Sequence, residues 1–475
     1  MRGANKLAMA VVLTMAGSAS AALAQSAASE DNGYPAGQET YPPQTNTVFG
    51  QPETPFEPAT LPVLDWAVGL GYEHTDNVNR VASDPVNQDI LQPTLNFTYR
   101  QQGSAVQAQV TGIIQYTDYL QGFYDNDIFG QLSGQLNWVI SPKRLNFDIE
   151  DYASVQPVNT RVSNAPSNLQ QVNVFVAGPT LTFLMGDALA GEADLRYINS
   201  TASKSKSYDS QRGMGAFRVI RNLTPTDTLS GNVQATHVDF NNVDPLVGTS
   251  NYNKYDVYLQ YQRILTHLNL NLALGASRID FSQGTSSRSG GYVQASATWQ
   301  ASARTSLALG ATSQITDSTA NLAQSPNLAT ITLTNPNLQI GSSVITPSVY
   351  RENSLNLGYA YLGPRFTFNL SSYYTRLRPL NTTGDVARNG YVVSAGATYL
   401  IQPLLTLGAT ASYQVTEYIS DHSRDRDPAF SVYLSREMTP HWSWSVTLAH
   451  NGRLTTMPGL GYQENQLFAI LYYRR

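Results

Sequence analysis

The side chains that could do nucleophilic or acid–base chemistry in this 475-residue chain are few and scattered. The chain has no Cys, which excludes a thiol nucleophile, a disulfide framework and a Cys-ligated metal. His74 with Asp76 is the candidate acid–base pair. Ser445 and His450 would be the pair for a lipase or deacylase active on the outer face of a barrel. They are five residues apart, so in one strand they point to opposite faces and cannot meet.

No catalytic motif adds to these residues. The chain contains no G-x-S-x-G element, Walker loop, H-E-x-x-H pair or dinucleotide fingerprint. We therefore predict no enzymatic activity, no cofactor and no metal site. A barrel enzyme that modifies lipid or polymer remains the alternative from a different class.

Composition narrows the function further. Only 13% of residues are charged, the net charge is −5, and 28 residues are Tyr. A nucleic-acid-binding protein would need a basic patch, which this charge balance does not favour. Little charge, modest apolar content and abundant Tyr are typical of a wall with one lipid face and one water face.

The first 24 residues have the pattern of a secretory signal peptide. Arg2 and Lys6 precede an apolar stretch at residues 7–17, and Ala22-Leu23-Ala24 fits the cleavage rule. The apolar stretch is too short to span a bilayer. Cleavage would remove two of the 29 basic residues and no acidic one, which leaves 27 − 34 = −7. We expect export through the inner membrane.

Residues 25–62 are predicted to form a disordered, acidic, Pro-rich tether in the periplasm. They hold seven Pro and five acidic residues, and neither Lys nor Arg. A plain spacer is the favoured reading. The alternative is a segment that binds periplasmic export or synthesis components.

From residue 63 to the end, apolar and polar residues alternate with a period of two, which predicts β-strands. Val106, Val110 and Ile114 share one face, for example, while Gln107 and Gln109 share the other. We expect twenty strands, with eighteen or twenty-two as alternatives because boundaries err by a few residues. The expected ranges are 64–74, 88–100, 104–119, 126–140, 143–155, 168–184, 187–200, 206–221, 226–239, 251–264, 266–281, 288–300, 304–316, 347–362, 365–377, 389–401, 404–420, 427–438, 441–452 and 462–474.

The connections alternate between short and long, which predicts an all-β, antiparallel up-and-down transmembrane barrel. Short periplasmic turns and long extracellular loops would place both termini in the periplasm. The five Trp fall near the expected periplasmic ends on the apolar phase, as an aromatic girdle would: Trp66, Trp138, Trp299, Trp442 and Trp444.

The polar phase should line the lumen, and much of it is amide or hydroxyl. Charged lumen candidates cluster between the fifth and tenth strands: Asp148, Glu150, Glu192, Asp194, Arg196, Arg212, Arg218, Lys254 and Asp256. They could set a field across a pore, or they could pair with each other and stiffen the wall. We expect the longest internal loop, 317–346, to form an external hairpin; a lumen constriction or two extra wall strands are the alternatives.

One stretch resembles a known family. The segment 71–80 holds a Tyr-x-x-x-Asp-Asn-Val-x-Arg element, with Tyr72, Asp76, Asn77 and Arg80. Together with the closing stretch 465–475, it resembles the β-barrel porin family of exopolysaccharide-biosynthesis operons. The resemblance implies an outer-membrane barrel through which an exported polysaccharide passes. It implies no catalytic residue, and it makes the 76–80 element a structural feature of the first loop.

Our main hypothesis from the sequence is therefore a passive outer-membrane channel for a secreted polysaccharide in a Gram-negative bacterium. A general diffusion porin for small solutes is the second hypothesis. A TonB-type transporter is disfavoured because about 38 residues before the first strand cannot supply a folded plug.

Overall fold

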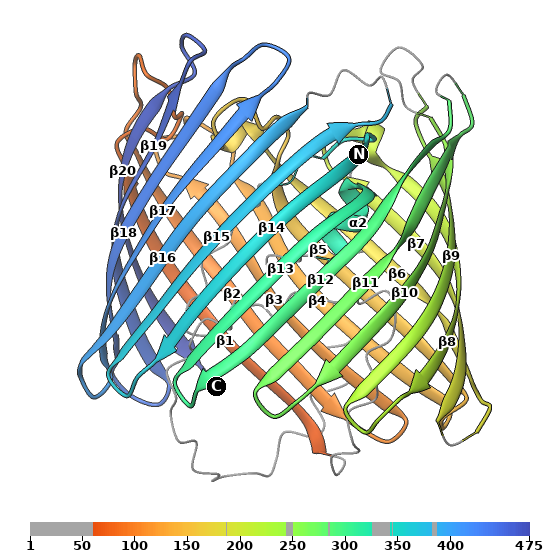
Figure 1. Ribbon diagram of the computed structural model, residues 1–475. Helices are drawn as coiled ribbons and strands as arrows, with labels where there is room; N and C mark the ends of the chain where they lie inside the picture. The colour runs from red at the N-terminus through yellow and green to blue at the C-terminus, as the bar shows by residue number, and fades with distance from the viewer. Residues whose placement is uncertain are drawn as a thin grey trace.

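The chain forms a closed antiparallel β-barrel of twenty strands (Figure 1), which confirms the predicted fold class. The computed structural model describes residues 60–186, 188–243, 250–283, 286–324, 343, 345–381 and 387–475. The predicted signal peptide, the tether up to residue 59 and the middle of loop 317–346 lie outside the described residues. No helix in the described part of the chain is long and apolar enough to cross a membrane.

The strands are 13 to 16 residues long and follow one another around the barrel. Their bounds are β1 Thr60–Thr75, β2 Gln88–Gln102, β3 Val106–Tyr119, β4 Asp127–Ser141, β5 Leu145–Pro157, β6 Leu169–Leu184, β7 Leu189–Ala202, β8 Ser210–Asn222, β9 Asp227–Phe240, β10 Tyr252–Ile264, β11 Leu268–Phe281, β12 Arg288–Ser302, β13 Thr305–Asp317, β14 Val349–Leu362, β15 Phe366–Pro379, β16 Arg388–Gln402, β17 Leu405–Tyr418, β18 Arg424–Glu437, β19 Trp442–Thr455 and β20 Tyr462–Arg474. In the described residues, three short helical segments interrupt the loops: η1 Pro166–Asn168, η2 Lys206–Tyr208 and α2 Ser318–Gln324.

Every strand pairs with the next in sequence, and β20 closes the ring on β1. The closing seam runs from Ala67↔Arg474 to Thr75↔Gln466 and contains nine residue pairs, against fourteen between β1 and β2. β1 begins and the chain ends at the same end of the barrel, the lower end in Figure 1. We call this the short-turn end and the opposite one the long-loop end.

The predicted strands agree with the observed ones to within a few residues, and two differences have physical causes. β1 begins at Thr60, so the last three residues of the predicted tether belong to the wall, where Thr60 pairs with Gln102. The strand predicted from residue 206 begins only at Ser210. The preceding residues form η2, which buries Tyr208 in an apolar cluster inside the barrel.

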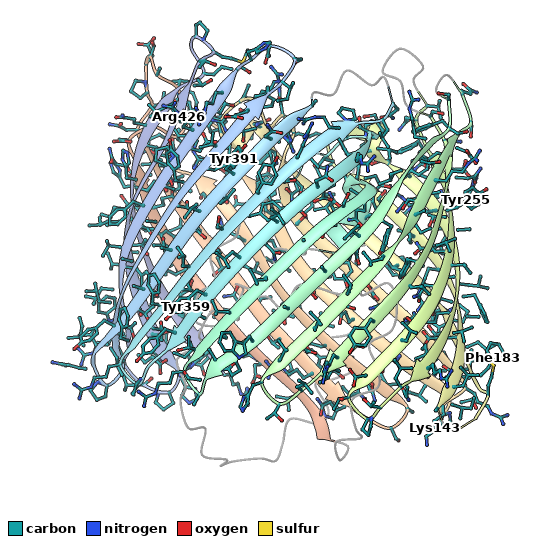
Figure 2. The ribbon with its side chains drawn as sticks, in the orientation of Figure 1. Lys143, Phe183, Tyr255, Tyr359, Tyr391 and Arg426 are labelled. Carbon is teal, nitrogen blue, oxygen red and sulfur yellow. The ribbon has the colours of Figure 1, made fainter. Side chains whose placement is uncertain are left out.

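The outer face of the wall is apolar and exposed. Leu195 and Leu259 are each 62% exposed, and Leu448 is 60% exposed. Tyr255 and Tyr391 lie toward the long-loop end, while Phe183 and Tyr359 lie toward the short-turn end (Figure 2). Strands of this length, with an apolar outer band between two aromatic rings, are the wall of a transmembrane barrel.

All five Trp stand on the outward phase at the short-turn end. Trp138 and Trp299 are each 50% exposed and Trp442 is 42% exposed. The Tyr473 ring lies between two of them, with ring centroids 6.0 Å from Trp66 across the seam and 5.2 Å from Trp442 on β19. The Trp side chains therefore form one band on the outer face at this end, as in an aromatic girdle.

Candidate functional site: the inner wall and two inward-folding loops

The inner face of the barrel carries mostly polar side chains, with apolar clusters on some strands. On β2, for example, Gln92, Thr94 and Asn96 are buried inside, while Leu95 between them is exposed outside. The side chains alternate because successive Cβ atoms of a strand point to opposite faces. The inner wall is therefore built largely of amides and hydroxyls, with charged side chains concentrated on one arc.

This charged arc extends over β5 to β10 and contains the nine predicted lumen candidates. Arg196 on β7 lies at its centre and its guanidinium contacts Asp148 on β5 at 2.6 Å. The same group donates to the Thr180 hydroxyl at 2.6 Å and lies 3.4 Å from Asp194. With a side chain only 2% exposed, Arg196 satisfies two acidic groups that the wall buries.

The neighbouring charges are paired in the same way. Arg218 on β8 contacts Glu192 at 3.0 Å and Asp194 at 2.9 Å. On β10, Lys254 contacts Asp256 at 3.1 Å. These ion pairs favour pairing, the second alternative left open by the sequence: Arg196 joins β7 to β5, Arg218 joins β8 to β7, and Lys254 pairs with Asp256 within β10.

Glu150 completes the arc through neutral partners. Its carboxylate accepts a 2.8 Å hydrogen bond from the Tyr152 hydroxyl, which itself accepts one from Gln135 at 2.9 Å. The arc therefore continues into the amide-lined wall of β4.

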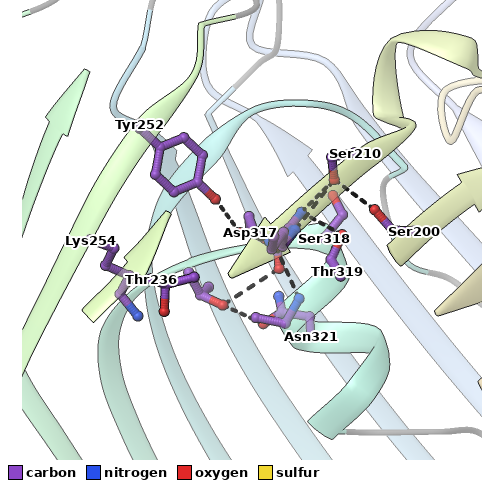
Figure 3. A network of polar contacts seen from close by, with 12 residues as sticks. Ser200, Ser210, Thr236, Tyr252, Lys254, Asp317, Ser318, Thr319 and Asn321 are labelled. Atoms are coloured by element: carbon purple, nitrogen blue, oxygen red, sulfur yellow. Dashed lines mark hydrogen bonds and ion pairs between the residues drawn. The ribbon is translucent and has the colours of Figure 1, made fainter. Parts of the chain in front are cut away.

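The ninth candidate, Arg212, joins the wall to loop 317–346. Its guanidinium contacts Asp317 at 2.6 Å and donates to the Thr319 hydroxyl at 2.6 Å. Tyr252 donates a further hydrogen bond to Asp317, and the Asp317 carboxylate also caps the backbone N–H of Ala320 (Figure 3). Asp317 is the last residue of β13, so this buried ion pair fixes the start of the loop to β8 and β10.

Apolar packing holds the same loop inside the barrel. β6 presents Val172, Val174 and Val176 inward, and they pack against Leu322 and Ala323 of α2 together with Ile345. The expected external hairpin is therefore wrong for both described ends of loop 317–346. Burial of these valines gives the loop an apolar surface to fold onto, which an external position would leave in water.

A second loop crosses the long-loop mouth. Residues 158–168, which we call the strap, connect β5 to β6 and end in η1. The Thr160 carbonyl accepts a 3.2 Å hydrogen bond from Tyr418 on β17, and the Thr160 hydroxyl accepts one from Arg388 on β16 at 3.1 Å. These strands lie on the opposite side of the ring from β5 and β6. The strap thus spans the mouth from one wall to the other.

Arg161 anchors the far end of the strap. Its guanidinium contacts Asp421 at 2.6 Å and lies 4.3 Å from the centre of the Tyr418 ring. Asp421 lies in the loop between β17 and β18. Hydrogen bonds from Arg161 and Ser423 hold the pKa of the Asp421 carboxyl well below its ordinary value. Both side chains are partly exposed, so this is a screened contact rather than a buried one.

Segment 71–80, which carries the family resemblance, joins β1 to β20 at the long-loop end of the closing seam. Asp76 accepts hydrogen bonds from the backbone and side-chain N–H groups of Asn465 at 2.8 and 2.7 Å. Asn77 donates to the carbonyl of Gln463 at 2.8 Å. Tyr72, on the outer face, donates to Asp89 at 2.7 Å.

Arg80, at the end of this element, connects the seam to the strap. Its guanidinium contacts Glu464 of β20 at 2.8 Å and donates to the carbonyl of Asn164 at 2.7 Å. Although burial opposes the charge, Glu464 and the other nearby acidic groups leave the pKa of Arg80 above its ordinary value. The first loop therefore clasps β1 to β20 and supports the strap.

The structure separates the candidate acid–base and nucleophile pairs. His74 contacts Asp89 at 2.7 Å rather than Asp76, so that prediction is wrong: β1 pairs His74 directly with Asp89. His450 hydrogen-bonds with Asn465 at 2.9 Å, and Ser445 lies on the opposite phase of β19. Within the described ranges no group of three His, Asp or Glu residues is placed to hold a metal ion.

Sequence reasoning missed the residues that position the strap: Arg161, Arg388, Tyr418 and Asp421. Their partners lie more than 200 positions away along the chain, and no periodic pattern marks such a contact. Asp317 was visible as the one charge at the start of its loop, although its inward ion pair was not.

No family model matches the chain, and no curated protein matches it. Among solved structures, the FrpB iron transporter from Neisseria meningitidis aligns with a TM-score of 0.45 at 10% identity, covering 86% of this chain and 82% of that one. A mutant of the ferric enterobactin receptor PfeA from Pseudomonas aeruginosa gives 0.47 at 10%, covering 87% and 80%. OccAB4 from Acinetobacter baumannii gives 0.38 at 10%, covering 89% and 100%. At this identity no residue's role carries over to this chain.

Proposed function

We propose that this protein is an outer-membrane channel of a Gram-negative bacterium through which a secreted exopolysaccharide passes. The observation that carries the proposal is the combination of a closed, lipid-facing barrel with an inner wall of amides and hydroxyls whose charges are mostly paired. Such a wall offers hydrogen bonds to sugar hydroxyls and sets no strong preference for a charged solute. The resemblance of segment 71–80 points to the same role.

In this proposal the short turns face the periplasm and the strap faces the cell exterior. Synthesis of the polymer supplies the energy, since the role given to the chain is passive. The N-terminal segment before β1 then lies on the side where polymer synthesis and export components work.

A diffusion porin for small solutes is the second candidate. It is favoured by the strap and α2, which bring backbone into the mouth and the lumen and so narrow the path. A polymer channel must move the strap aside, whereas a small-solute pore need not.

Conductance of the refolded mature chain in a planar bilayer tests the proposal. We expect open current steps that long neutral oligosaccharides block. Steps without block would instead favour the diffusion porin. In cells, deletion should abolish polymer secretion and leave uptake of small solutes unchanged; the reverse result would reject polymer export.

A further inference from the structure

Among the residues that the structure describes, three neighbouring polar side chains of the inner wall have buried polar atoms with no hydrogen-bond partner. They are Thr94 and Asn96 on β2 and Tyr472 on β20, which are 6%, 1% and 2% exposed. The Thr94 hydroxyl, both polar atoms of the Asn96 amide and the Tyr472 hydroxyl make no hydrogen bond. Buried polar groups are normally paired, because an unpaired one loses its bond to water and gains nothing.

These side chains form one patch around Gly69 of β1. Gly69 pairs with Thr94 on one side and Tyr472 on the other, and Ala67 pairs with Asn96. A Cβ at Gly69 would collide with the Tyr472 ring and with the Thr94 hydroxyl, so the glycine allows both groups to close over β1. We call Thr94, Asn96 and Tyr472 the Gly69 patch. It places three hydrogen-bond donors and an aromatic ring on the inward face of the wall.

The chain itself supplies a segment with matching chemistry. Residues 25–59 carry six Pro and five acidic residues, and neither Lys nor Arg. A proline-containing extended segment has carbonyl acceptors that no internal hydrogen bond uses, and aromatic side chains with hydroxyl or amide donors bind such segments. Arg100 has the inward phase of β2, and it lies between the patch and the short-turn end. It gives the acidic residues of the segment an opposite charge.

The point of attachment favours this segment over any other occupant. Residue 59 continues directly into β1, the strand that carries Gly69, at the short-turn end of the barrel. An extended segment covers about 3.1 Å per residue, so 35 residues reach well beyond the length of one strand.

We propose that residues 25–59 enter the barrel from the short-turn end and dock on the Gly69 patch. The docked segment satisfies the Thr94, Asn96 and Tyr472 donors with its carbonyl oxygens and occupies part of the lumen. The inference goes beyond the proposed channel activity and does not depend on which solute the channel carries.

Cysteine accessibility tests the proposal in a chain that has no native Cys. Thr47→Cys, within the segment, should react slowly with a bulky water-soluble maleimide. Adding Tyr472→Phe and Asn96→Ala should raise the rate about tenfold, as expected for the loss of two hydrogen bonds. Tyr433→Phe is the matched control, since Tyr433 is also an inward tyrosine whose ring covers a glycine, Gly408.

A second measurement does not rely on the patch variants folding. Asn96→Cys should become about tenfold more reactive when residues 25–59 are deleted, while Thr410→Cys on the inward phase of β17 should not change. A fast Thr47→Cys reaction in the otherwise native chain would overturn the proposal. The proposal would also be overturned if the reaction rate of Asn96→Cys did not change on deletion and fell only when a neutral oligosaccharide was added. The patch would then bind the transported solute.

Discussion

At the residue scale, the inner wall separates two kinds of charged contact. Arg196 is almost completely buried and binds acidic groups from two strands. Arg161 is partly exposed and binds one acidic group of a distant loop. Removing one partner of a buried ion pair leaves an uncompensated charge, while an exposed pair contributes little to stability and is weakened by salt. The first contact is suited to hold the wall, and the second is suited to release.

Arg196→Ala should destabilise the barrel by about 3–5 kcal/mol, because Asp148 and Asp194 lose their shared cation in a buried site. Urea-induced unfolding of the protein in detergent measures the effect. Arg278→Ala is the control: Arg278 contacts Asp280 at 2.9 Å with its side chain 59% exposed. Equal losses in the two variants would contradict the assignment.

Arg161→Ala and Asp421→Asn should each free the strap and raise the open fraction of single channels at neutral pH. High salt should do the same to the native protein, because the pair is exposed to screening. Arg424→Ala, which removes a pair with Glu417 and leaves the strap contacts in place, is the control. If neither substitution changes the open fraction of the channel, the strap does not limit the path.

The pH dependence of the same contact follows from the lowered pKa of Asp421. A carboxyl with a lowered pKa in the folded state contributes above its ordinary pKa and loses this contribution as the pH falls through the lowered value. Acidification from about pH 7 to about pH 5 should therefore leave the open fraction unchanged, and the strap should loosen only in strong acid. Current traces recorded across this range provide the measurement; opening near neutral pH would assign control to another group.

At the element scale, the strands were predictable and the inward loops were not. Alternation in stretches such as 405–413 depends only on which face meets lipid, and that is a local property of the chain. Loop 317–346 follows a different rule. The place of its described ends is decided by Val172, Val174 and Val176 on β6, an apolar run on the inward phase of that strand. The strap depends on single contacts with residues far away in the sequence, which no local pattern contains.

Leu322→Asp should release α2 from β6 while the barrel stays closed. A carboxylate among the three valines is buried without a partner, so the helix gains by moving into water. We expect noisier, larger currents and protease cleavage within loop 317–346, with an unchanged shift between heated and unheated protein on gels. Leu322→Met should behave as the native chain, since it keeps the apolar volume.

At the scale of the whole molecule, the five Trp give the barrel one marked end. All of them face outward at the short-turn end, where an aromatic ring sits at the lipid–water boundary. Lipids brominated near the headgroup should therefore quench Trp fluorescence more than lipids brominated near the chain terminus. The fluorescence lost in each of the five single variants, such as Trp299→Phe, should add up to the native signal. Stronger quenching by the deep bromines would place this ring of Trp within the hydrocarbon.

The seam between β1 and β20 has a consequence for how the protein is made. The first wall strand to leave the ribosome pairs with the last one, through only nine residue pairs. Until β20 pairs with β1, both strands are open edges, and open edges recruit other chains. Pairing at the two extremes of a sequence is also slow. The closure of this barrel therefore comes late in folding, and the Asp76 and Asn77 contacts to β20 form only with it.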